Sequence, residues 1–106
     1  MGEKVDKFRK MVEAFPASPL PRFSLANAYA DEGRYAEAIA EYELCLKAQP
    51  DWAACLIALG DAYARAGDKD RAADALRRAR VHAMKQGHGT MAGEAQEKLE
   101  DLGFED

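Results

Sequence analysis

Residues that favour β-strands are scarce in this chain of 106 residues. It contains one Thr, three Val and two Ile, whereas Ala, Glu, Asp, Arg, Lys and Leu are abundant. A sheet needs β-branched and aromatic residues to cover its faces, and there are too few of them here to form one. The composition therefore predicts an all-α protein, and the length predicts a single small domain.

Long apolar runs are missing as well. No stretch of roughly 18 apolar residues is present, so no segment of the sequence is predicted to span a membrane. The N-terminus carries Glu3, Lys4 and Asp6, which is too much charge for the apolar part of a secretory signal. We therefore expect a cytoplasmic location.

Residues suited to catalysis or metal binding are few and scattered. The only histidines, His82 and His88, are six residues apart, and Cys45 and Cys55 belong to no metal-binding motif. No glycine-rich nucleophile turn accompanies them. The sequence thus predicts no catalytic residue, no metal and no cofactor. The two cysteines are interpreted as small buried hydrophobic residues in a reducing compartment.

Strong positive charge is lacking too. The formal net charge is -4, which argues against nucleic acid as the main partner. A series of basic residues between Arg71 and Lys85 points several ways around one predicted helix, with no aromatic residues interleaved for stacking on bases. We interpret this series as a solvated charged face.

A recurring segment is the strongest positive feature. The stretch Leu25–Gly33 reads LANAYADEG, and 34 residues later Leu59–Gly67 reads LGDAYARAG. Leu, Ala, Tyr, Ala and Gly recur in register, and self-similarity at a fixed period of this size is typical of stacked repeats.

Apolar spacing and helix-breaking residues predict six helices. Pro16, Gly33, Pro50, Gly67 and the run Gly87–Gly89 separate segments in which apolar residues recur with helical spacing. The expected N-terminal caps are Ser18, Asp51, Asp68 and Thr90. The predicted helices cover about 3–15, 19–32, 35–48, 52–66, 69–86 and 91–102.

These residues resemble the tetratricopeptide repeat, a helix–turn–helix unit of about 34 residues. The resemblance implies a short right-handed α-solenoid of antiparallel helix pairs. It divides the chain into a leading half-repeat (1–18), two full repeats (19–52 and 53–86) and a capping helix with its tail (87–106). The matching residues are Leu25, Ala26, Tyr29, Gly33, Tyr35, Ala38, Tyr42, Cys45 and Pro50 in the first repeat, and Leu59, Gly60, Tyr63, Gly67, Ala72, Leu76 and Ala79 in the second.

The last helix departs from this pattern. A projection of the 34-residue period puts Thr90, Gly93 and Glu94 where large and small apolar residues are expected. Met84 also replaces the proline that ends the first repeat at Pro50. We therefore interpret the last helix as a cap that covers the apolar side of the fifth helix.

The resemblance implies a protein–protein interaction module, because in this family the first helix of each unit lines a concave surface that binds a peptide or a partner helix. Phe23 and Ile57 are equivalent across the period and are expected to form an apolar strip, unless they merely pack against neighbouring helices. The predicted binding residues are Leu20, Phe23, Asn27, Asp31, Ile57, Asp61 and Arg65.

Two other functions compete with this interpretation. The leading half-repeat leaves one face of the first helix without a neighbour, so self-association into a homodimer or larger homo-oligomer is the alternative. A receptor for chaperone C-termini is not expected, because the carboxylate clamp of such family members needs two Asn and several Lys or Arg, and only Asn27 matches.

Overall fold

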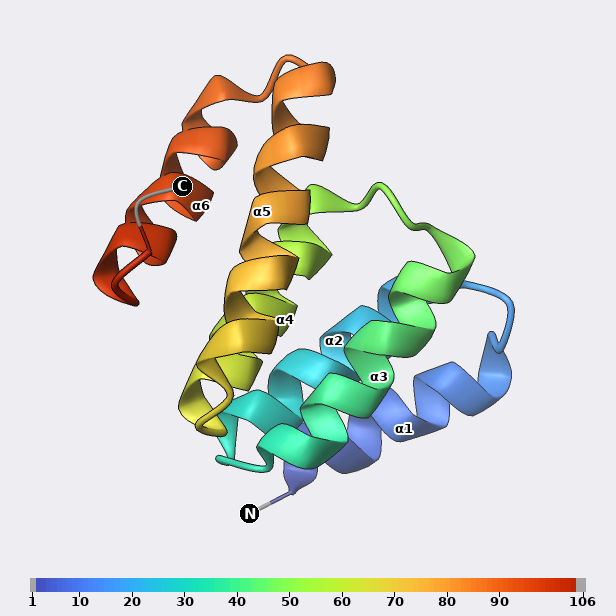
Figure 1. Cartoon of the computed structure of the whole chain (residues 1–106). Coiled ribbons are helices and arrows are strands. Elements are labelled where there is room, and N and C mark those ends of the chain that lie inside the picture. Colours follow the sequence, from blue (N-terminus) through green and yellow to red (C-terminus); the bar gives the residue numbers. More distant parts are fainter. Residues whose placement is uncertain (1, 105–106) are drawn as a thin grey trace.

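The computed structural model describes residues 2–104; Met1 and the last two residues of the predicted tail, Glu105 and Asp106, lie outside the described part. Six α-helices and no strand make up this part of the chain, as the composition predicts (Figure 1). The helices are α1 (Glu3–Ala14), α2 (Pro19–Asp31), α3 (Tyr35–Ala48), α4 (Ala53–Arg65), α5 (Lys69–Lys85) and α6 (Gly89–Asp101).

The helices end where the sequence predicts. Gly33, Gly67 and Gly87 follow α2, α4 and α5 with φ angles of 76°, 91° and 76°, in the left-handed region that glycine adopts without strain. Asp68 caps α5 through its side chain, which accepts a hydrogen bond of 3.0 Å from the backbone nitrogen of Arg71.

Two of the expected caps are wrong, and a third has the predicted position without the capping hydrogen bond. Ser18 lies at the N-cap position of α2, but its side chain makes no capping hydrogen bond. Trp52 precedes α4 at the position expected for Asp51, and His88 precedes α6, so Thr90 lies inside the first turn of that helix. These helix starts are therefore held by packing and backbone contacts and not by a polar side chain.

Consecutive helices pack side by side in one layered row. Each helix contacts its neighbours in sequence, from α1 against α2 through to α5 against α6, and α4 also touches α2 and α6. The turns between them are short, so neighbouring helices run antiparallel (Figure 1). The result is an elongated molecule of 40 × 28 × 19 Å.

The recurring residues form the core. Leu25 and Leu59 are 3% and 1% exposed, and Tyr42 and Leu76 are buried at matching positions of α3 and α5. Gly60 lets α4 approach α5 closely: a Cβ atom added there would lie 2.8 Å from Cγ of Leu76, closer than atoms pack. The repeated motif thus sets the distance between helices.

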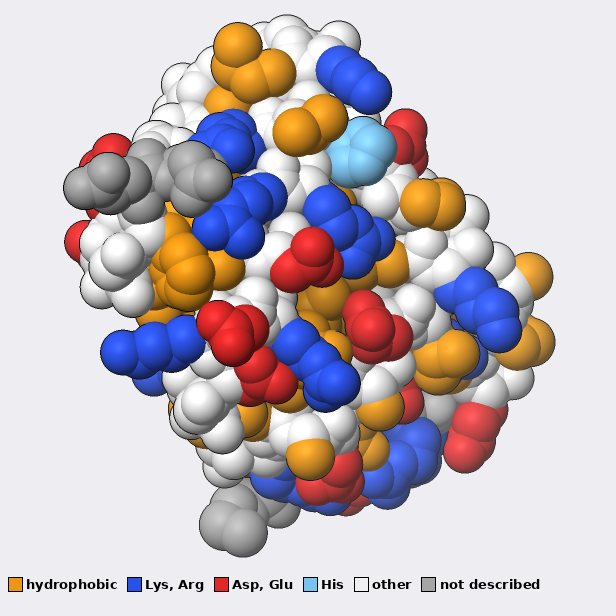
Figure 2. Space-filling view, viewed as in Figure 1, with side chains coloured by type: hydrophobic (Ala, Val, Ile, Leu, Met, Phe, Trp, Pro, Cys, Tyr) orange, Lys and Arg blue, Asp and Glu red, His pale blue; other side chains and the backbone are white. Residues whose placement is uncertain are grey.

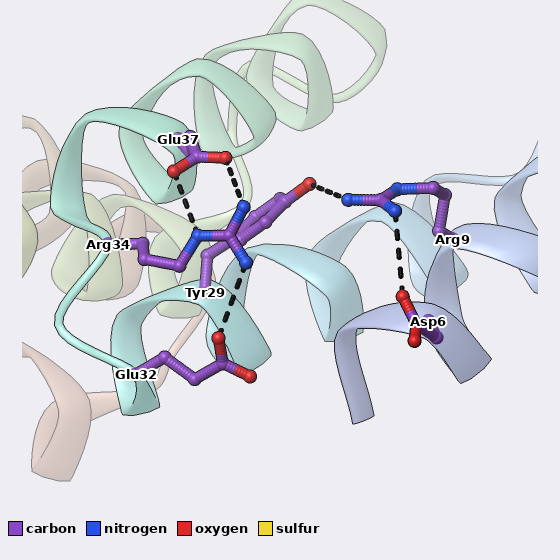
Figure 3. Close-up of polar contacts among 6 residues, drawn as sticks. All are labelled: Asp6, Arg9, Tyr29, Glu32, Arg34 and Glu37. Atoms are coloured by element: carbon purple, nitrogen blue, oxygen red, sulfur yellow. Dashed lines mark hydrogen bonds and ion pairs between the residues drawn. The ribbon is translucent and has the colours of Figure 1, made fainter. Parts of the chain in front are cut away.

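A polar cluster fastens α1 to the first repeat (Figure 3). The Arg9 guanidinium of α1 donates a 3.0 Å hydrogen bond to the hydroxyl of Tyr29, and the Arg34 guanidinium lies 4.6 Å from the centre of that ring. Arg34 also donates to Glu37 at 2.9 and 2.6 Å and pairs with Glu32 at 3.3 Å. These hydrogen bonds hold the pKa of Glu37 below its usual range.

The last helix is shifted in register. The start of α4 lies 34 residues after the start of α2 (19 to 53), but α6 starts 36 residues after α4 (53 to 89). The reason is that α5 has 17 residues and α3 only 14, while the connection after α5 (86–88) is one residue shorter than the connection after α3 (49–52). With no proline in the place of Met84, α5 continues further than α3 does. Counted by helix starts, Ala92, Ala95 and Leu99 stand where α4 has Leu56, Leu59 and Tyr63, and all three are buried.

Candidate functional site

A groove of about 420 Å³ lies between α2 and α4, with α3 behind it. Both helices are the first helix of their predicted repeats, so the groove lies on the face where the sequence predicts binding. Four of the seven predicted binding residues line it. The lining residues are Asn27, Ala30, Asp31, Tyr35, Tyr42, Ala58, Asp61, Ala62 and Arg65.

Asn27 is oriented by a tyrosine from α3. The hydroxyl of Tyr42 donates a hydrogen bond to Oδ1 of Asn27. Tyr42 is 2% exposed, and burial raises the pKa of its hydroxyl, so the group keeps its proton and remains a donor. With Oδ1 engaged in this way, the Nδ2 group of Asn27 is left to donate a hydrogen bond into the groove.

The charged groups of the groove differ in their partners. The carboxylate of Asp61 pairs with Nζ of Lys98, a residue of α6, at 3.2 Å. Asp31 and Arg65 are both exposed, and neither has an ion pair within residues 2–104. The groove therefore presents one carboxylate and one guanidinium, on neighbouring helices, that a ligand can pair with directly.

The expected apolar strip is not on the surface. Ile57 is 6% exposed and belongs to the hydrophobic core, because its side chain is enclosed by the packed helices. The ring of Phe23 is partly buried and makes tilted ring contacts with Trp52 and Tyr42, with ring centroids 4.6 and 5.9 Å apart. Packing against neighbours, the alternative left open for these two residues, describes their positions. Leu20 is 64% exposed but does not line the groove.

Two tyrosines of α3 in the groove were not among the predicted binding residues. Tyr35 and Tyr42 match the repeat pattern, and this makes them look like core residues only. A signal was available, because a buried tyrosine hydroxyl needs a hydrogen-bond partner, and Asn27 is a polar residue on the facing helix.

The cysteines lie inside the molecule. Both are 0% exposed, and each thiol donates to a backbone carbonyl: Cys45 to Pro19 at 3.6 Å and Cys55 to Tyr42 at 3.7 Å. The neighbouring Cys45 thiol, together with burial, raises the pKa of Cys55, so this group is not a ready nucleophile. Across residues 2–104, no three His, Cys, Asp or Glu side chains lie close enough to hold a metal ion.

Comparison with protein families gives a match to the tetratricopeptide repeat over residues 21–80, which is more than half of the chain. The chain belongs to the tetratricopeptide repeat family. The matched segment contains all but the first two residues of α2, the whole of α3 and α4, and most of α5, and so nearly all of both helices of the groove. Members of this family typically act as protein-binding scaffolds without catalytic activity.

Solved structures with the same fold were also found. A crystal structure of MamA superimposes with a TM-score of 0.69 at 16% sequence identity, covering 92% of this chain and 66% of that one. At this identity the likeness shows the fold alone. A comparison with curated proteins gave no match. None of the helices in residues 2–104 has both the length and the apolar character needed to cross a membrane.

Proposed function

We propose that this tetratricopeptide domain is a protein–protein interaction module that binds a segment of a partner protein in the groove between α2 and α4. The observation that carries the proposal is the convergence of Asn27, Asp31, Asp61 and Arg65 on one concavity of about 420 Å³. These residues lie far apart in the sequence and meet because two equivalent helices are stacked.

The chemistry of the groove favours recognition by polar contacts. The Nδ2 group of Asn27 donates to a backbone carbonyl of the bound segment, and the Tyr42 hydroxyl keeps it in position. Arg65 and Asp31 pair with side chains of opposite charge and so determine where the segment lies along the groove. Small residues such as Ala30, Ala58 and Ala62 leave room for the main chain of the partner.

Charge reversal at the two unpaired groups tests this proposal. Asp31→Arg and Arg65→Glu should each reduce capture of the partner from an extract of the native host by about tenfold or more. The reason is that each new side chain repels the charged group of the partner that the original side chain attracts. Both residues are exposed, so helicity and thermal stability should stay close to those of the unmodified protein. Phe23→Glu is a poor test, since it would also disrupt the ring contact with Trp52.

Lys69→Glu is the matched control, because Lys69 is an exposed cation at the start of α5, outside the groove. It should leave capture unchanged. If Arg65→Glu and Asp31→Arg retain the partner as well as Lys69→Glu does, the groove is not the binding site.

Self-association is a second candidate, favoured by exposed apolar side chains at the N-terminal end. Met11, Phe15 and Leu20 are 37%, 60% and 64% exposed, and α1 contacts only α2 among the helices. Light scattering over a dilution series tests this candidate: an oligomer that becomes a monomer on Phe15→Glu substitution supports it, and a monomer at every concentration excludes it.

A further inference from the structure

A second groove lies on the other side of the molecule from the cluster around α1, between α5 and α6. Its volume is about 570 Å³. Val81 and Met84 of α5 form one wall and are 47% and 64% exposed, although both side chains are large and apolar. The floor is made by Gly89, Ala92 and Gly93 of α6. Figure 2 shows hydrophobic side chains beside Lys and Arg side chains over the upper part of α5 and α6.

The groove is open because α6 has small side chains where α4 has large ones. Counted from the helix starts, Ala92 and Gly93 take the places of Leu56 and Ile57. Leu56 and Ile57 are 0% and 6% exposed and fill the space beside α4. The equivalent space beside α6 has no side chain of its own, and it is large enough to accept one from another molecule.

Gly93 has no role that the chain itself explains. It lies inside α6, where glycine weakens a helix, and its φ angle is not positive. A Cβ atom added at Gly93 would meet nothing within 4 Å, whereas one added at Gly60 would meet Leu76 at 2.8 Å. At Gly60 the missing side chain lets Leu76 approach the helix backbone. At Gly93 the corresponding space is empty and is available to a ligand.

The charged residues among the described residues that line this groove, Arg80 and Lys85, are both cations. The carboxylate of Glu100 lies outside the lining, where it accepts a hydrogen bond from Gln96 at 3.1 Å. Arg80 donates one hydrogen bond to Gln96, which leaves most of its guanidinium donors for other partners. No ion pair within residues 2–104 involves Arg80 or Lys85. An apolar hole with a cationic rim is complementary to an aliphatic side chain that has carboxylates beside it.

We propose that the α5–α6 groove binds an acidic amphipathic helix of a partner protein. One aliphatic side chain of that helix inserts between Val81 and Met84 above Gly93, and its carboxylates pair with Arg80 and Lys85. This surface is separate from the groove between α2 and α4, and the two grooves share no lining residue. The proposal does not depend on the proposed function of the first groove.

Methyl NMR of the full chain with labelled methionines tests the proposal, since Met84 lies in the groove and Met11 lies at the far end of the molecule. The probe is a synthetic helical peptide of about 16 residues, roughly four turns, with a central Leu flanked by Glu on one face. We expect a saturable shift of the Met84 methyl signal and none of the Met11 signal. A matched peptide with Lys in place of each Glu should have an affinity that is lower by at least about tenfold.

Two variants and one control locate the site. Gly93→Leu fills the hole and should reduce affinity for the acidic peptide by about tenfold or more, while circular dichroism confirms the fold. Lys85→Glu should reduce it as well and should improve binding of the lysine peptide. Lys69→Glu, at the exposed start of α5 and outside both grooves, should change neither.

Three results would overturn the proposal. The first is an unshifted Met84 signal at about 1 mM acidic peptide, the weak limit of specific binding. The second is that the Gly93→Leu variant binds the acidic peptide as tightly as the unmodified protein does, or that the lysine peptide binds as tightly as the acidic peptide. The third is a Met84 shift that depends on protein concentration without any peptide, because it assigns the groove to a second copy of this chain.

Discussion

Helix α5 has two sides that are packed in opposite ways. Toward α4, Leu76 is 1% exposed and fills the space above Gly60 so closely that a Cβ atom there would lie 2.8 Å from it. Toward α6, Val81 and Met84 remain 47% and 64% exposed above Gly93, where an added Cβ atom would meet nothing within 4 Å. The side toward α4 is closed by the chain itself, whereas the side toward α6 leaves Val81 and Met84 exposed beside the buried Ala92, Ala95 and Leu99.

This difference shows what the repeat specifies and what it leaves to the last helix. Within the matched segment, residues 21–80, small and large side chains alternate so that each helix fills the next. Beyond that segment, α6 is shifted by two residues, and the residues that it buries are Ala92, Ala95 and Leu99. Glycine therefore has opposite roles in two helices of the same small protein.

Loss of Leu76 should have the largest effect on this comparison. Leu76→Ala removes a side chain that is 1% exposed and leaves a cavity between α4 and α5, so we expect the free energy of unfolding to fall by about 2–5 kcal/mol. Urea unfolding followed by circular dichroism measures the change. Met84→Ala, on the open side of α5, should stay within about 0.5 kcal/mol of the unmodified protein. Similar losses for both variants would show that the two sides of α5 do not differ.

A methyl group at Gly60 should have the next largest effect. Gly60→Ala improves helix propensity by about 1 kcal/mol, but overpacking against Leu76 costs about 1–3 kcal/mol. We therefore expect a net loss of about 1 kcal/mol in the free energy of unfolding, measured by the same urea titration.

The double variant Gly60→Ala/Leu76→Ala separates overpacking from other causes. With the Leu76 side chain removed, the new methyl group has room, so the combined loss should be smaller than the sum of the two single losses. Simple additivity would mean that contact with Leu76 is not the reason for Gly60.

The same substitution at Gly93 should have the smallest effect and the opposite sign. Gly93→Ala restores helix propensity where nothing obstructs the methyl group, so the free energy of unfolding should rise by about 0.5–1 kcal/mol. Thermal or urea unfolding measures the gain. A loss of stability at Gly93 would contradict the open contact between α5 and α6 on which the second groove depends.

Part of the candidate site could be predicted from the sequence and part could not. Asn27, Asp31, Asp61 and Arg65 follow from the position of α2 and α4 in the repeat, and the structure brings them to one groove. Ile57 occupies a position in the first helix of its repeat that predicts an exposed binding residue, yet it is 6% exposed. Helical periodicity identifies the face of a residue, but the exposure of that face depends on how closely the next helix approaches.

The sequence by itself determined the helices, their ends and their stacking order. Gly33 and Gly67 end helices because only glycine adopts the left-handed angle without strain, and the small residues at positions 26 and 60 allow the helices to approach. These constraints are local or periodic, so they can be recognised in the sequence alone.

Only the tertiary structure decided which surfaces stay open. The longer α5 moves α6 out of the 34-residue register, and this shift leaves Ala92 and Gly93 opposite Val81 and Met84. The depth of a groove and the exposure of its side chains depend on contacts from several helices, so they cannot be predicted from one segment of the sequence. Both grooves of this tetratricopeptide domain, the polar one between α2 and α4 and the apolar one between α5 and α6, arise in this way.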